Sequence, residues 1–322
     1  MTTQRGSEIR RFAEGRLHTL VQVLQSHGMT SMPVRARVLP RKLVLLVSLS
    51  HGVSIDKVRA RSRDIGMALQ ARTVDVQHEA GHAAVTVPLP EQFWRKPVFG
   101  RMLSRVTMSA SRQDHEGVQC LLGLDDQGQV LTLNLASPAT PHLLVAGTTG
   151  AGKTNLLRSM LASLVLLNAP GQLQIVLIDV KDYEFETFSN VPHLLYPVVT
   201  TPADWPAAVG QVITRMRQRR RAKGQARETT PRFLLVIDEV ATVLDRYHGL
   251  EPALKELTAT GRAEGCHAIL ATQKPSAESL STLITSNLPA RIAGPCASAT
   301  DARLITGHPQ SGAEKLPGSG SF

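Results

Sequence analysis

The front of the chain carries apolar residues at helical spacing. Gly28 ends this pattern, whose apolar members are Ile9, Phe12, Leu17, Leu20, Val21 and Leu24. Residues three and four positions apart share one face of a helix, so the spacing predicts an amphipathic helix of about five turns. We expect its apolar stripe to pack into an ordinary core rather than to form a groove for a partner.

A β-rich stretch follows. The segment from Lys42 to Leu49 is apolar and comes after Pro40, so we predict a strand there. Ser54 can cap a helix from Ile55 to about Leu69. Beyond it the pattern predicts a pair of strands, Thr73–Gln77 and Ala83–Val87, and then a short helix, Pro97–Val106. A hairpin is expected next, with strands Val118–Leu124 and Gln129–Leu135 on either side of the turn Asp125-Asp126-Gln127-Gly128.

In the second half of the chain, apolar strands alternate with amphipathic helices. The predicted strands are Leu143–Ala146, Leu173–Ile178, Phe233–Ile237, His267–Thr272 and Arg291–Ala293. One predicted helix directly follows the first strand, and two more span Ala207–Arg221 and Pro252–Glu264. Alternation of this kind is typical of a parallel sheet flanked by helices. The expected fold class is therefore α/β, preceded by a smaller β-rich α+β domain.

Length and composition favour more than one core. The chain has 322 residues, of which 42% are hydrophobic, enough for one sizeable core and a second smaller one. A run of small residues and proline from Ala136 to Thr140 marks a boundary. We predict an N-terminal helical segment (1–36), a β-rich α+β domain (37–135) and an α/β domain (136–322).

The charge balance indicates a polyanionic partner. The formal net charge is +10, and the segment before Pro141 holds 18 basic and 11 acidic residues, so the front of the chain is its more basic part. Net charge governs association with nucleic acid or acidic membranes rather than fold. The alternative is a basic protein that is merely soluble.

Cysteine usage and the N-terminus favour a reduced, cytoplasmic protein. Cys120, Cys266 and Cys296 are odd in number and far apart, which fits neither a disulfide framework nor a metal knuckle. The N-terminus lacks the apolar core of a secretory signal, and no apolar run approaches the roughly 18 residues that span a bilayer. We therefore expect no membrane segment.

The first chemical motif lies between a strand and a helix. The segment fits G-x-x-x-x-G-K-[ST] at every specified position, and its residues are Gly147, Thr148, Thr149, Gly150, Ala151, Gly152, Lys153 and Thr154. Glycines let consecutive N–H groups surround an anion, and the helix N-terminus favours it as well. Lys153 would neutralise the β- and γ-phosphates of ATP, and the Thr154 hydroxyl would ligate Mg²⁺. A chance match is disfavoured because the flanking patterns are those the motif requires.

A second motif completes a nucleotide site. The strand Phe233–Ile237 ends in Asp238 and Glu239. We expect Asp238 to approach Mg²⁺ and Glu239 to polarise the attacking water. An acidic pair at an exposed strand end is the alternative, and the phosphate-binding motif upstream disfavours it.

Two more strand ends carry polar residues of less certain role. Gln273 follows His267–Thr272, where it either senses the γ-phosphate or is a satisfied polar residue in a loop. Asp179 and Lys181 end another strand at the edge where ligands of open α/β sheets gather. The sequence leaves open whether Asp179 touches the site.

A basic run and several histidines are ambiguous. The run comprises Arg215, Arg217, Arg219, Arg220, Arg221 and Lys223, whose spacing scatters side chains around a helix. A solvated face is favoured over contact with a phosphate backbone. His142 and His193 lack metal-ligand spacing, so we assign them core or surface roles.

These motifs together resemble the FtsK/SpoIIIE family of DNA-translocating ATPases. The segments that carry the resemblance are PHLLVAGTTGAGKT (141–154), LIDVK (177–181), NVPHLL (190–195), LLVIDEVA (234–241), GRAEGCHAILATQKPS (261–276), SNLPARIA (286–293) and GAEKLPGSG (312–320). The similarity covers the back half and extends more weakly to about Val38.

The resemblance implies a RecA-like motor over 136–322 that assembles as a ring, usually a hexamer, around double-stranded DNA. It implies an ATPase with Lys153 and Thr154 at phosphate and Mg²⁺, Asp238 and Glu239 at metal and water, and Gln273 as sensor. Ring motors also supply an arginine to the neighbour's nucleotide, since a cation there stabilises transition-state charge. Arg262 and Arg291 both lie in family-like segments and remain alternatives.

The chain departs from the family pattern at several points. Val180 stands where members commonly have proline, and Lys274 where they have arginine, so local contacts are uncertain. With nothing after Phe322, we expect no winged-helix module and no sequence readout of DNA polarity. Chromosome segregation and transfer of plasmids or integrated elements remain alternative roles. A protein-secretion ATPase and a nucleotide-dependent DNA-binding scaffold are the rival functions.

Overall fold

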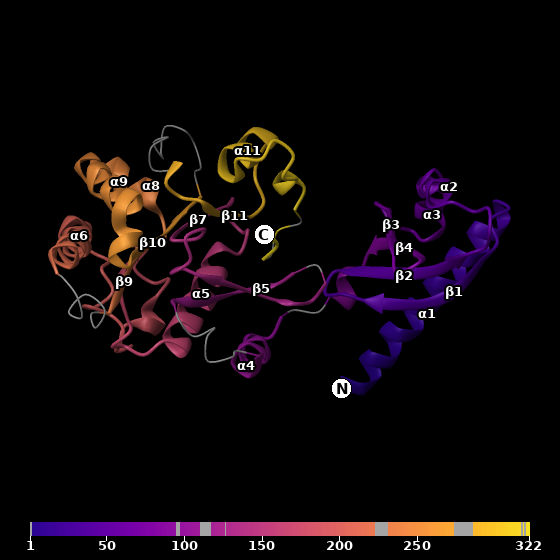
Figure 1. The fold of residues 1–322 in the computed structure, drawn as a ribbon, viewed down its shortest axis with the longest axis horizontal. Coiled ribbons are helices and arrows are strands. Elements are labelled where there is room, and N and C mark those ends of the chain that lie inside the picture. Colours follow the sequence, from indigo (N-terminus) through magenta and orange to yellow (C-terminus); the bar gives the residue numbers. More distant parts are fainter. Residues whose placement is uncertain are drawn as a thin grey trace. The chain divides into compact units, whose positions relative to one another are not determined.

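The computed structural model describes residues 2–94, 97–109, 117–125, 127–222, 231–273, 286–316, 318 and 320–322. Internal contacts divide the chain into two compact units, residues 1–101 with 123–130, and residues 102–122 with 131–322. The elements of both are labelled in Figure 1.

The first unit is an antiparallel sheet packed on a long helix. Its helices are α1 (Thr2–Ser26), α2 (Ile55–Arg59) and α3 (Ser62–Ala68), with a 3₁₀ turn at Glu91–Phe93. The strands β1 (Ser31–Val38), β2 (Lys42–Leu49), β3 (Asp75–Glu79) and β4 (His82–Pro88) pair in the order β1-β2-β4-β3. Leu20 and Leu24 of α1 are fully buried against Leu43 and Leu45 of β2, so the predicted stripe is core.

The structure of this unit differs from two predictions. The predicted helical segment over 1–36 contains the start of β1, an edge strand with half of its side chains exposed. Its apolar residues do alternate, but Pro33 interrupts the pattern, and proline is tolerated in a strand only at a sheet edge or a bulge. The single helix predicted from Ile55 is two helices, although Ser54 caps the first as expected by accepting a hydrogen bond from the Lys57 N–H at 3.3 Å.

The second unit is built on a five-stranded parallel sheet. Its strands are β7 (His142–Ala146), β8 (Leu173–Ile178), β9 (Arg232–Ile237), β10 (Cys266–Thr272) and β11 (Ala290–Ala293), in the order β11-β7-β10-β9-β8. The helices are α4 (Phe99–Ser109, which crosses the division), α5 (Lys153–Leu167), α6 (Trp205–Arg221), α8 (Val240–Arg246), α9 (Glu251–Thr260) and α11 (Ala299–Thr306). Short 3₁₀ turns lie at Glu186–Phe188, Pro202–Asp204, His248–Leu250, Gly261–Glu264 and Ala313–Lys315. The predicted α/β class is confirmed.

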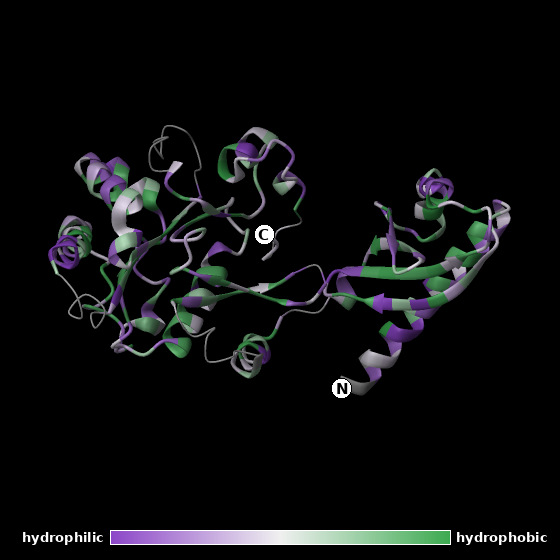
Figure 2. Ribbon diagram, viewed as in Figure 1, coloured by the Kyte–Doolittle hydropathy of each residue, from purple (hydrophilic) through white to green (hydrophobic). Residues whose placement is uncertain are grey.

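Helices cover both faces of this sheet. Leu144 of β7 packs with residues of α6, α8 and α9, whereas its neighbours Leu143 and Val145 pack with α5. Successive residues of a strand point to opposite faces of the sheet. Because helices cover both faces here, the residues that point to either face are apolar. Figure 2 shows this as hydrophobic strands in the centre and a hydrophilic outer side on α6.

A hairpin of β5 (Gln119–Leu124) and β6 (Val130–Asn134) joins the two units along the chain. Cys120 and Leu135 lie in the core beneath α5, and the Leu121 N–H donates to the Ser163 hydroxyl at 2.8 Å. We predicted a domain boundary at residue 136, whereas these contacts place part of the hairpin in the second unit. The division into three domains stays a prediction.

Candidate nucleotide-binding site

The turn between β7 and α5 has the backbone that a phosphate-binding loop needs. Gly150 and Gly152 have φ values of +82° and +97°, a region that residues with a side chain rarely adopt. Gly152 immediately precedes α5, which begins at Lys153. The strand, the glycine turn and the helix therefore follow one another as the motif requires.

Close packing fixes the start of this loop. A Cβ on Gly147 would lie 3.1 Å from the Ala151 Cβ and 3.2 Å from the Gly294 Cα, so a side chain there would displace the loop. The Thr148 N–H donates to the Pro295 carbonyl at 2.9 Å, and its hydroxyl donates to the same oxygen at 3.1 Å. The segment after β11 thus supports the loop from one side.

Lys153 and Glu239 meet, although 85 residues of chain separate the two motifs. The Lys153 Nζ lies 3.2 Å from Glu239 Oε2 and donates to the Asp238 carbonyl at 2.5 Å. Lys153 is 6% exposed, and its burial lowers the pKa of the amine while the nearby Glu239 charge opposes that shift. The parallel arrangement of β7 and β9, with β10 between them, brings the two motifs to one edge of the sheet.

Asp238 is buried at the end of β9. Its Oδ1 accepts a hydrogen bond from the Val180 N–H at 3.0 Å. Burial raises the pKa of this carboxyl to about 6, and the neighbouring Asp179 charge adds to the shift. A bound cation would favour the ionised form. Asp238, and Thr154 at the start of α5, carry the oxygen ligands that Mg²⁺ prefers and are the residues that would hold it.

Glu239 is held by contacts from β10. Its Oε1 accepts a hydrogen bond from the Thr272 hydroxyl at 2.6 Å, and the Gln273 N–H lies 3.0 and 2.9 Å from the two carboxylate oxygens. The carboxylate is therefore fixed in orientation beside Lys153. Sequence analysis did not identify Thr272, which reads there as one more β-branched strand residue.

Gln273 connects the end of β10 to the phosphate loop. Its Oε1 accepts a hydrogen bond from the Thr149 hydroxyl at 2.9 Å. Every motif residue assigned to phosphate, metal, water or sensing thus lies at the carboxyl end of β7, β9 or β10. Roles for the individual residues stay predictions.

Comparison with known proteins identifies the class of this site. A sequence model of the FtsK/SpoIIIE family matches residues 102–230, which include the phosphate loop. The protein called DNA translocase FtsK in Mycobacterium leprae is 33% identical over 302 residues, covering 85% of this chain. Its counterpart in Staphylococcus aureus is 29% identical over 327 residues, covering 94%. The chain belongs to the FtsK/SpoIIIE family.

The chain spans between a third and two fifths of the length of these FtsK/SpoIIIE relatives, 35% and 40% of the two named. Among solved structures, the pCW3 conjugation coupling protein TcpA has the same fold, with a TM-score of 0.59, 16% identity and coverage of 94% of this chain and 89% of that one. The type VII secretion ATPase EccC of Thermomonospora curvata gives a TM-score of 0.57 at 25% identity, covering 66% and 27%.

The two arginines that the FtsK/SpoIIIE resemblance singled out lie in different settings. Arg262 is exposed in the 3₁₀ turn before β10, at the opposite edge of the sheet from the phosphate loop of the same chain. Arg291 is half-buried, and its guanidinium donates to the Leu288 carbonyl at 2.9 Å and the Ile305 carbonyl at 3.2 Å. Which of them serves a neighbouring subunit stays open.

Asp179 of the family-like LIDVK segment shapes a loop. Its Oδ1 accepts from the Lys181 N–H at 3.1 Å and its Oδ2 accepts from the Phe185 N–H at 3.0 Å. Both oxygens are occupied by backbone groups, so Asp179 acts on the site mainly through the charge that it adds near Asp238.

Three arginines of the basic run on α6 are paired within the chain. Arg217 donates to Glu256 at 2.6 Å, Arg219 is 9% exposed and donates to the Pro231 carbonyl at 2.7 Å, and Arg220 donates to the Thr260 hydroxyl at 2.7 Å. These contacts join α6 to α9 and to Pro231, directly before β9, while Arg215 and Arg221 are exposed. Lys223 and the departure at Lys274 lie outside the described residues.

Buried histidines have structural roles. The His142 Nδ1 accepts from the Ala268 N–H at 3.1 Å, and burial lowers the pKa of His142 to about 4. His193 Nε2 lies 2.7 Å from the Asn168 carbonyl. Within the described ranges, no group of three or more His, Cys, Asp or Glu residues is arranged to hold a metal ion.

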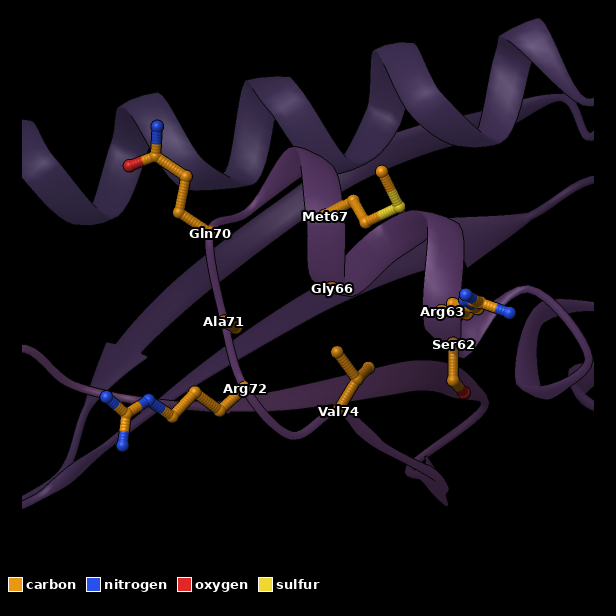
Figure 3. Close-up of a pocket in the computed structure, with 8 residues that line it drawn as sticks. All are labelled: Ser62, Arg63, Gly66, Met67, Gln70, Ala71, Arg72 and Val74. Carbon is orange, nitrogen blue, oxygen red and sulfur yellow. The ribbon is translucent and has the colours of Figure 1, made fainter.

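A separate hollow of about 410 Å³ lies in the first unit. Figure 3 shows Arg63 and Arg72 at its ends, with Met67 and Val74 between them. Its lining has neither a carboxylate nor a phosphate loop, so it is not the site described above.

Among the described residues, no helix combines the length and the hydropathy of a membrane span.

Proposed function

We propose that this ATPase moves double-stranded DNA, in the cytoplasm, by cycles of ATP binding and hydrolysis. The observation that carries the proposal is the contact of Lys153 with Glu239 and the Asp238 carbonyl at one sheet edge. Relatives about 30% identical are named DNA translocases, and the net charge of +10 suits a polyanionic substrate.

Each residue would act at a different part of the nucleotide. Loop amides and Lys153 would bind the phosphates, and Thr154 and Asp238 would hold Mg²⁺, which neutralises phosphate charge when bound. Glu239, fixed by Thr272, would orient water toward the γ-phosphate. Gln273 would report the presence of that phosphate through its hydrogen bond to Thr149.

Assembly as a ring, with six subunits as in the family pattern, would complete the site. An arginine supplied by a neighbour would stabilise transition-state charge. The exposed Arg262 suits this role better than Arg291, which is bound to carbonyls of its own chain. DNA would be held through phosphate contacts without base readout, so its binding should weaken steeply with salt.

A protein-secretion ATPase is the second candidate, because EccC shares 25% identity over 66% of the chain. A scaffold with vestigial hydrolysis is the third, and the intact contacts around Glu239 argue against it. The cellular process would be chromosome segregation or transfer of plasmids or integrated elements.

One measurement separates these candidates. ATP turnover is measured with and without long linear double-stranded DNA, for the wild-type chain and for Lys153→Ala. Stimulation by DNA that disappears in Lys153→Ala supports the DNA motor. Turnover indifferent to DNA favours protein cargo, and absence of turnover in the wild-type chain favours the scaffold.

A further inference from the structure

The last residues of the chain lie against the phosphate-binding loop. The Gly320 N–H donates to the Ala151 carbonyl at 2.8 Å, so the tail is hydrogen-bonded to the loop itself. In Figure 1 the C-terminus accordingly lies near α5, which begins where this loop ends.

Phe322 is seated at the same place. A Cβ built on Gly294 would lie 3.0 Å from the Ala151 Cβ and 3.0 Å from the Phe322 Cε1, so the ring, the loop and the segment after β11 meet at one glycine. Phe322 nevertheless remains 39% exposed. An aromatic side chain that packs against Gly294 and keeps over a third of its surface exposed therefore stands beside the loop.

The chain leading to this tail is anchored. Ala293, Cys296, Ile305 and Ala313 form a small buried cluster with Ala146 of β7. The Cys296 N–H donates to the Ala313 carbonyl at 3.4 Å. The tail thus approaches the loop from a packed support.

The chemistry of a nucleotide suggests what the ring contacts. A nucleotide gripped by its phosphates leaves the ribose and base outside the loop, within one nucleotide's length of it. Every base has a π-face that stacks on aromatic side chains, and such a contact needs an exposed ring. Phe322 meets both conditions of position and exposure. We propose that Phe322 stacks on the base of the bound ATP and so forms the base subsite of this chain.

The inference rests on ATP binding at the proposed site, and its test separates the base from the phosphates. Dissociation constants are measured by calorimetry for a non-hydrolysable ATP analogue and for inorganic tripolyphosphate, which has no base. Phe322→Ala should weaken binding of the ATP analogue about tenfold, the order expected for the loss of one stacked base. Affinity for tripolyphosphate should stay within about twofold of that of the wild-type chain. Phe322→Trp should restore affinity for the analogue.

If Phe322→Ala weakened binding of the analogue and of tripolyphosphate by the same factor, the proposal would be overturned, because the ring would then only support the loop. Unchanged affinity for the analogue would overturn it as well. Lys153→Ala is the control and should weaken both ligands. A wild-type chain that binds neither ligand would refute the nucleotide site itself, an outcome distinct from failure of the Phe322 contact alone.

Discussion

The Thr272 hydroxyl donates a 2.6 Å hydrogen bond to the Glu239 carboxylate. Thr272 is fully buried at the end of β10, and Glu239 follows β9, so the bond crosses between neighbouring strands. Hydrogen bonds to charged groups are worth roughly 1.5–3 kcal/mol, about twice a neutral bond. Together with the Gln273 N–H, this bond fixes where the carboxylate lies.

Thr272→Val should lower kcat by about tenfold or more, because the isosteric change removes a bond of that strength from the residue that orients water. Affinity for ATP should change little, since the Thr272 hydroxyl bonds Glu239 and Thr272 lies outside the phosphate-binding loop. Thr272→Ser, which keeps the hydroxyl, is the matched control. A Thr272→Val enzyme with wild-type kcat would show that the bond does not matter for turnover.

Glu239→Gln should retain ATP binding and lose turnover by about 10²–10⁴-fold, the usual contribution of a general base. The amide keeps the size of the side chain and can still accept from Thr272. Single-turnover hydrolysis and nucleotide binding would be measured in parallel. Normal single-turnover rates in this variant would remove Glu239 from its proposed role.

Gly152→Ala should destabilise the loop and weaken nucleotide binding. Its φ of +97° is unfavourable for a residue with a side chain, and strain of this kind costs roughly 1–3 kcal/mol. Gly249→Ala is a suitable control, because Gly249 has no positive φ and a Cβ there meets nothing within 4 Å. Equal ATP affinities of the two variants would contradict the proposed conformational requirement.

Asp238 should make stability depend on pH. Its folded pKa is raised from 3.8 to about 6, so the folded state binds the proton more tightly than the unfolded state. The contribution of protonated Asp238 to the free energy of unfolding is fully present below about pH 4 and is lost as the pH rises through 6. This contribution amounts to at most about 3 kcal/mol. Asp238→Asn, a neutral mimic, should therefore raise the melting temperature at pH 7.5 and not at pH 4.

The control for this pH dependence is Asp245→Asn at an exposed position. Melting would be followed without nucleotide or divalent cation, since a cation would favour the ionised carboxylate. If Asp238→Asn raised the melting temperature equally at pH 4 and at pH 7.5, desolvation of the Asp238 carboxylate would not be the cause of the stabilisation.

Local patterns allowed much of the second unit to be predicted from sequence. Buried strands such as Leu173–Ile178 were bounded correctly because both sheet faces are covered, which makes each strand a short, continuous apolar run. The phosphate loop was predictable because its glycines and its lysine are required at fixed spacing.

Features that depend on distant parts of the chain were not predictable. The strand β1 carries alternating apolar residues, but half of its side chains are exposed and it contains Pro33, so its pairing with β2 at a sheet edge decides its conformation. Thr272 and Phe322 gain their significance from partners 33 residues away and from the contact with Gly294. The sequence also left Asp179 undecided, because only the fold shows that both of its oxygens accept backbone hydrogen bonds.

The position of β10 has a mechanical consequence. This strand lies between β7 and β9, and its end is bonded to Thr149 on one side and to Glu239 on the other. A displacement of either Thr149 or Glu239 would therefore act on the same residue, Gln273. If ATP is cleaved at this site as proposed, we expect the two halves of the site to move together through β10.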